Sequence, residues 1–205
     1  MMSKIESLIL GLFFGLLPPG ICLLVTLVFT GIVFGVEVFE AWALWSLGPG
    51  IIVDVIFLKR WVKNAYQMST KVLVPIYLFY SVVALGLGMG VPIFNFVLCI
   101  AAGVYIARKM HLAGANEERR NEAFKKMALF CAAVTVLICC LITLWAIAGE
   151  MIGYTFETPY LSFTFTAPIF LAVVVIGGTV LVLLQYWLTR TAATVTFKLL
   201  PVTLG

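Results

Sequence analysis

The sequence predicts an all-α integral membrane protein, a polytopic bundle of six transmembrane helices with both termini in the cytoplasm. Hydrophobic residues make up 63% of the 205-residue chain and charged residues only 11%, whereas soluble domains carry about 45–50% and about 25%. A water-soluble fold of this size could not bury so much apolar surface. Several apolar runs reach the roughly 18–20 residues that cross a bilayer, and they are continuous rather than alternating, which favours helices.

Six spans follow from these runs, within a single transmembrane domain that covers residues 1–205. Their expected bounds are 8–34, 41–58, 72–89, 92–107, 127–148 and 167–188. The N-terminal run is longer than the core of a signal peptide and is not followed by a small-residue cleavage site, so we expect an uncleaved first span.

The first span is interrupted near its middle by Pro18, Pro19 and Gly20. A helix over residues 8–34 would be about 40 Å long, more than the hydrocarbon core needs. Consecutive prolines lack amide donors and clash with the preceding turn, so we expect a single crossing that is kinked at Pro18-Pro19. The alternative is a re-entrant hairpin that turns at these residues, which would leave five full crossings and place Lys4 outside.

The basic residues set the orientation. With six spans and both termini inside, all 13 Lys and Arg residues lie on one side: Lys4, Lys59, Arg60, Lys63, Lys71, Arg108, Lys109, Arg119, Arg120, Lys125, Lys126, Arg190 and Lys198. The other side holds Glu37, Glu40, Glu150 and Glu157. The positive-inside rule therefore predicts a cytoplasmic membrane location with both termini cytoplasmic. Orientation explains the net charge of +4 without a nucleic acid partner.

Asp54 is the one ionisable residue clearly inside an apolar run. A carboxylate deep in the bilayer costs about 2.5–3.5 kcal/mol on insertion scales, so it marks a candidate transport or binding site. A structural alternative is that Lys59 or Arg60 reaches back to pair with it. On a helix, Glu40, Gly50 and Asp54 share one face, which suits a cation or proton route.

Two helix breaks near mid-depth complete the candidate site. Broken helices expose backbone groups that must face protein or a polar cavity, and transporters build binding sites from them. The candidate residues are Asp54, Glu40, Gly48, Pro49, Gly50, Pro18, Pro19 and Gly20. The alternative is close helix packing, because Gly11/Gly15, Gly31/Gly35 and Gly86/Gly90 have GxxxG spacing.

The sequence contains no recognisable catalytic motif, so no enzyme activity is expected. The five cysteines lie in predicted spans without CxxC spacing, and His111 lies in a polar loop, so neither a metal nor another cofactor is expected. Asn95 and Gln185 could hydrogen-bond a ligand, although such residues more often bond across helices.

Two connecting segments carry further signals. In the polar loop, Asn116 suits a helix N-cap and Glu122 an i,i+4 pair with Lys126, so we expect a solvated extension of the fifth span. A nucleotide or lipid-headgroup site there is the alternative. Residues 153–168 alternate aromatics with Thr and Ser, which favours an anchor in the headgroup region over a lid across a vestibule.

Together these features favour a small permease-like protein or the membrane component of a transport system, with a passage between the first, second and sixth spans. The competing hypothesis is a non-transporting subunit or assembly protein that packs against partner helices or a second copy. In size and helix count the bundle resembles the six-helix substrate-binding components of energy-coupling-factor vitamin transporters. That likeness is one of topology, and no residue role follows from it.

Overall fold

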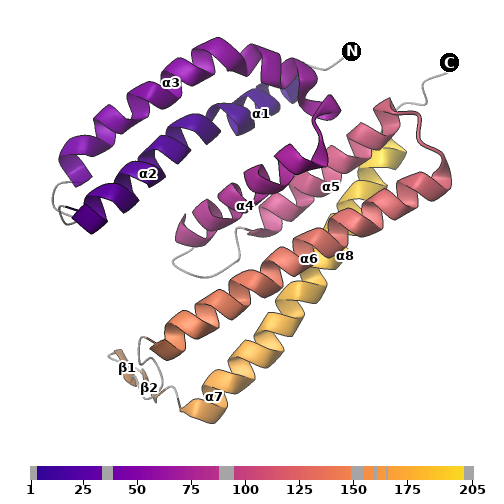
Figure 1. Cartoon of the computed structure of the whole chain (residues 1–205). Coiled ribbons are helices and arrows are strands. Elements are labelled where there is room, and N and C mark those ends of the chain that lie inside the picture. Colours follow the sequence, from indigo (N-terminus) through magenta and orange to yellow (C-terminus); the bar gives the residue numbers. More distant parts are fainter. Residues whose placement is uncertain are drawn as a thin grey trace. The chain divides into compact units, whose positions relative to one another are not determined.

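The computed structural model describes residues 4–33, 39–87, 95–148, 155–158, 161–164 and 166–200 (Figure 1). Among these residues the secondary structure is helical except for one pair of short strands. The chain divides into two compact units, Met1–Val72 and Leu73–Gly205.

The first unit begins with α1 (Lys4–Gly15) and α2 (Leu17–Val33), which form one apolar helical run, Ser7–Thr30. Backbone hydrogen bonds continue through the junction, from Leu16 N to Leu12 O and from Gly20 N to Leu16 O, both at 3.1 Å. The helical hydrogen-bond ladder is incomplete around Leu16 because Pro18 and Pro19 have no amide hydrogen to bond the carbonyls four residues back. For this reason α1 and α2 are two elements rather than one. The segment is therefore one continuous helical run, long and apolar enough to cross a membrane, and it does not turn back at Pro18 and Pro19 as the re-entrant hairpin requires.

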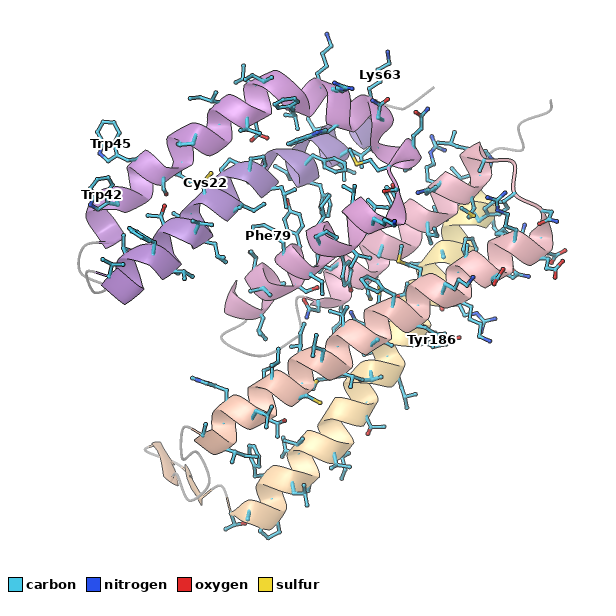
Figure 2. All side chains as sticks on the ribbon, in the orientation of Figure 1. Cys22, Trp42, Trp45, Lys63, Phe79 and Tyr186 are labelled. Atoms are coloured by element: carbon cyan, nitrogen blue, oxygen red, sulfur yellow. The ribbon has the colours of Figure 1, made fainter. Side chains whose placement is uncertain are left out.

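Helix α3 (Phe39–Asn64) packs along both α1 and α2 and contains Pro49 without ending there. It extends past the predicted end at residue 58, through the basic residues, to the 3₁₀ turn η2 (Ala65–Gln67). Trp42, Trp45 and Lys63 project outward from α3 (Figure 2), and Trp45 is 78% exposed. Exposed indole rings on an apolar helix are typical of contact with the lipid headgroup region.

The second unit contains α4 (Thr70–Leu87, which begins at the unit boundary), α5 (Asn95–Leu112), α6 (Glu117–Ala148), α7 (Ala167–Ala172), the π-helical turn η3 (Val173–Gly177) and α8 (Gly178–Leu199). Helices α5, α6 and α8 pack against one another. On α5 and α8 the buried residues recur every four positions: Asn95, Cys99, Gly103 and Ala107 on α5, and Gln185, Thr189 and Ala193 on α8. We call the contact between these two rows, most of whose members are small, the α5–α8 seam. Small side chains let the two backbones approach closely.

The loop before α6 has the local structure that its sequence predicts. The Asn116 side-chain oxygen accepts a hydrogen bond from Arg119 N at 3.1 Å, and Lys126 Nζ lies 2.8 Å from Glu122 Oε1. Both interactions depend on residues within one helical turn of each other. The helical extension of the fifth span is thus confirmed.

Helix α5 ends at a Schellman motif. Gly114 has φ of +57°, its N–H bonds His111 O, and Ala115 N bonds Met110 O, both at 3.1 Å. The left-handed conformation favours glycine because it has no Cβ. The motif turns the chain directly from α5 into α6.

The strands β1 (Thr155–Thr158) and β2 (Leu161–Thr164) form an antiparallel pair in which Thr155 is opposite Thr164. No strand was predicted in this segment, which was expected to be an anchor in the headgroup region or a lid. Aromatic residues alternate with Thr and Ser at a period of two, which is the pattern of a strand. This alternation could therefore have predicted the strand pair from the sequence.

Three described helical runs are long and apolar enough to cross a membrane: Ser7–Thr30, Glu117–Ala148 and Ala167–Leu199. The number rises to four if Trp45–Gln67 and Lys71–Leu85 are one broken span. Large apolar side chains are exposed along these helices, as expected where lipid rather than water is the solvent. The structure therefore supports a helical membrane protein, and six crossings remain a prediction.

Candidate functional site

Two of the predicted site motifs meet in the first unit, where α3 crosses α2. A Cβ placed on Gly50 would lie 2.4 Å from both Pro19 Cα and Pro19 N and 2.7 Å from the carbonyl carbon of Pro18. Pro18 and Gly50 are buried, whereas Pro49 is exposed and a Cβ on Gly48 would have nothing within 4 Å. The two segments that were predicted to break are thus both helical, and one backbone fits against the other at Gly50, which supports close packing there.

Asp54 lies one turn after Gly50 on α3. Its Oδ1 is inaccessible to solvent and has no hydrogen-bond partner within the described part of the chain. Lys59 and Arg60 are exposed, and neither forms an ion pair with Asp54 in that part. Five and six residues separate them from Asp54, so neither reaches the i+3 or i+4 position that faces it. The expected pairing is therefore not present.

The remaining predicted residues have simpler surroundings. Gly20 is a half-buried residue of α2, and its N–H bonds Leu16 O. Glu40 belongs to the first turn of α3, and its side chain lies outside the described residues. The face that Glu40 shares with Asp54 on α3 thus remains a prediction.

A buried polar cluster in the second unit centres on Gln185 of α8. Gln185 Nε2 donates to Asn95 O of α5 at 3.2 Å and to Tyr77 Oη of α4 at 3.3 Å. Gln185, Asn95 and Ser81 of α4 are each 1% exposed. Because Asn95 O can only accept, the amide nitrogen of Gln185 must face it. Gln185 thus ties α8 to both α4 and α5.

Several polar atoms of this cluster have no hydrogen-bond partner among the described residues. They are Gln185 Oε1, Asn95 Oδ1 and Asn95 Nδ2; Ser81 Oγ, one turn after Tyr77 on α4, has no partner there either. A buried polar group without a partner costs about 1–3 kcal/mol. The cluster therefore has unused donors and acceptors in a setting where most buried polar groups are paired.

The wall of the cluster consists of small hydroxyl and thiol side chains. Thr189 Oγ1 donates to Gln185 O at 2.9 Å, and Thr135 Oγ1 donates to Cys131 O at 3.1 Å. The Cys131 thiol neighbours the Tyr77 hydroxyl. These hydroxyls bond their own helix backbones, so they do not satisfy the amides of Asn95 and Gln185.

Two cysteines are small buried groups in this unit, whereas Cys140 is exposed. Cys99 and Cys131 are 0% exposed, and all five cysteines are free thiols. Within the described ranges, no three His, Cys, Asp or Glu side chains come together in a group that could hold a metal ion. Cys99 and Cys131 therefore pack as small apolar groups beside the polar cluster.

No protein-family model, curated protein or solved structure matches this chain. The chemistry of the polar cluster therefore has to follow from its own residues and their contacts.

Proposed function

We propose that this chain is a small permease-like protein, or the membrane component of a transport system, whose polar cluster binds a small uncharged polar solute. Six crossings, cytoplasmic termini and a place in the cytoplasmic membrane belong to this proposal. The one-sided distribution of the 13 Lys and Arg residues supports them.

The observation that carries the proposal is the set of polar atoms on Asn95, Gln185 and Ser81 that have no hydrogen-bond partner within the described ranges. A single bond from Gln185 to Asn95 O would be enough to hold two helices together. The two amide oxygens, the amide nitrogen and the hydroxyl offer both acceptors and donors to a bound molecule. A solute with hydroxyl or amide groups could satisfy them, and the absence of a formal charge on these three side chains favours a neutral solute.

Replacing Gln185 with leucine should abolish this binding while keeping the side chain's volume. In proteoliposomes that contain the full chain, we expect glycerol or urea permeability to fall about tenfold, which corresponds to about 1.4 kcal/mol of lost hydrogen bonding. The rate of vesicle volume recovery, followed by stopped-flow light scattering after an osmotic step, measures it.

The matched control is Gln67→Leu, because Gln67 is an exposed glutamine of η2 outside the cluster. This variant should leave permeability unchanged. If the wild-type chain is no more permeable to either solute than empty liposomes, the solute proposal is contradicted.

In the proposed transporter, Asp54 would be the residue that binds a proton or a cation. Its buried Oδ1 without a described partner is suited to receive a proton or a cation. We expect Asp54→Asn to reduce proton influx into proteoliposomes several-fold and Asp54→Glu to retain most of it, because only glutamate keeps a titratable group. Entrapped pyranine fluorescence after a pH jump reports the flux. Equal fluxes for the wild type and Asp54→Asn would remove Asp54 from the proposed site.

A non-transporting subunit or assembly protein is the second candidate. The observation in its favour is the bare surface around η3, where Ile176 is 66% exposed and a Cβ on Gly177 or Gly178 would meet nothing within 4 Å. Helices that leave such small residues uncovered are suited to packing against another helix. Normal folding together with no flux of glycerol, urea or protons would favour this candidate.

A further inference from the structure

A pocket of about 520 Å³ lies at the end of the second unit, away from the polar cluster. Its lining residues come from the α5–α6 turn and the last turns of α8. Figure 1 shows these two segments at the same end of the helices. The lining residues are Met110, His111, Gly114, Ala115, Arg120, Asn121, Phe124, Thr194, Phe197, Lys198 and Leu200. Its volume falls within the range of sites for small organic molecules.

The floor of this pocket is a packed apolar cluster. Met110 and Phe124 are 9% and 4% exposed, and Ala107 and Ala193 beneath them are fully buried. The Schellman motif fixes one wall, because Ala115 packs against the same cluster. The pocket is therefore built on rigid elements and does not depend on a loose loop.

The polar part of the pocket is cationic. Arg120 and Lys198 are basic, and Asn121 adds hydrogen-bond donors, whereas the Thr194 hydroxyl donates to Arg190 O at 2.9 Å. None of the lining residues is an aspartate or a glutamate. The field inside the pocket therefore favours an anion.

Arg120 is held in position before any ligand arrives. Its guanidinium carbon lies 4.5 Å from the centre of the Phe197 ring, and Nη2 lies 3.5 Å from Glu117 Oε1. The Arg120 side chain is 24% exposed, whereas that of Glu117 is 80% exposed. An ion pair with so exposed a carboxylate contributes little, so the guanidinium retains capacity for a second anion. Stacking on the ring restricts its orientation and reduces the entropy lost on binding.

The ends of α5 and α8 also carry exposed apolar side chains. Leu112, Val195 and Leu199 are 55%, 49% and 78% exposed. None of the three lines the pocket itself. The two helix ends thus combine a cationic pocket with apolar surface elsewhere on the same turns.

We infer that this pocket binds a phosphate group, with Arg120 and Lys198 as its charged contacts. The guanidinium fork and the ammonium match phosphate oxygens in charge and geometry. The phosphate could belong to an anionic lipid headgroup, whose acyl chains would meet the exposed apolar side chains of these helix ends, or to a free phosphate ion. The inference does not depend on the proposed transport.

Calorimetric titration of the full chain in detergent micelles tests the inference with three probes: short-chain phosphatidylglycerol, short-chain phosphatidylcholine and sodium phosphate. We expect Lys198→Ala and Arg120→Gln each to weaken the binding of phosphatidylglycerol or phosphate roughly fivefold, the effect of about one cation near an anionic surface. Lys125→Ala is the matched control, because Lys125 is an exposed cation of α6 outside the pocket lining.

Each outcome has a distinct meaning. Binding of phosphatidylglycerol alone identifies a lipid headgroup, and binding of sodium phosphate as well identifies the phosphate ion as sufficient. If Lys125→Ala weakened the binding of the anionic probes as much as Lys198→Ala did, the binding would be general attraction to a basic surface, and the inference would be overturned. It would also be overturned if neither phosphatidylglycerol nor sodium phosphate bound the wild-type chain. Lys198 has an exposed side chain, so its variant keeps the test valid even if Arg120→Gln impairs folding.

Discussion

Replacing Gly50 with alanine should push α2 and α3 apart and destabilise the first unit. The new Cβ would lie 2.4 Å from Pro19 Cα, an atom of the backbone that no side-chain rotation can move away. Overpacking of this kind costs about 1–3 kcal/mol. The measurement is the midpoint of thermal unfolding of the full chain in detergent micelles, followed by circular dichroism.

Gly48→Ala is the matched control for this prediction. Gly48 lies two residues away on the same helix, and a Cβ there would have nothing within 4 Å. Because alanine is favoured over glycine in a helix by roughly 0.5–1 kcal/mol, Gly48→Ala should be neutral or slightly stabilising. Equal midpoints for the two variants would contradict the close contact between α2 and α3.

The second large effect is expected at Gly103, in the α5–α8 seam. A Cβ on Gly103 would lie 2.5 Å from Thr189 O and 3.0 Å from the Cβ of Ala192. Gly103→Ala should therefore destabilise the second unit by about 1–3 kcal/mol. Because Thr189 is one turn from Gln185, separation of the helices should also weaken the bond from Gln185 to Asn95 and lower solute permeability.

The control for this second prediction is Gly177→Ala, since Gly177 has open space where its Cβ would be. Unfolding midpoints in detergent micelles and glycerol permeability in proteoliposomes are measured on the same preparations. If Gly103→Ala kept the wild-type midpoint of thermal unfolding, the α5–α8 seam would be able to widen without loss of stability, and the prediction would be contradicted.

Local features of the fold could be predicted from the sequence because their partners lie within one turn. The cap at Asn116, the pair of Glu122 with Lys126 and the continuity of the first span all depend on neighbours along the chain. Helical spacing and hydrogen-bond chemistry fix such contacts.

Contacts between distant segments could not be predicted in the same way. Gln185 and Asn95 are 90 residues apart, and both were recognised as polar residues in apolar spans, but their pairing depends on which faces of α5 and α8 meet. The GxxxG pair Gly11/Gly15 has the spacing of a packing motif, yet Gly11 has open space and Gly15 has only an ordinary contact with Leu58 at 3.5 Å. Spacing identifies a smooth helix face, but it does not identify the helix that covers that face.

The π-helical turn η3 affects how the last helical run can be covered by neighbours. A π turn holds one more residue than an α turn, so α7 and α8 are out of phase by about 100° relative to an uninterrupted helix. In an uninterrupted helix Ala167 and Gln185 would lie on the same face. The π turn rotates α8, so a partner helix that contacts Ala167 would not face Gln185. A neighbouring helix aligned with one face of the run before Gly177 would therefore meet a different face after it.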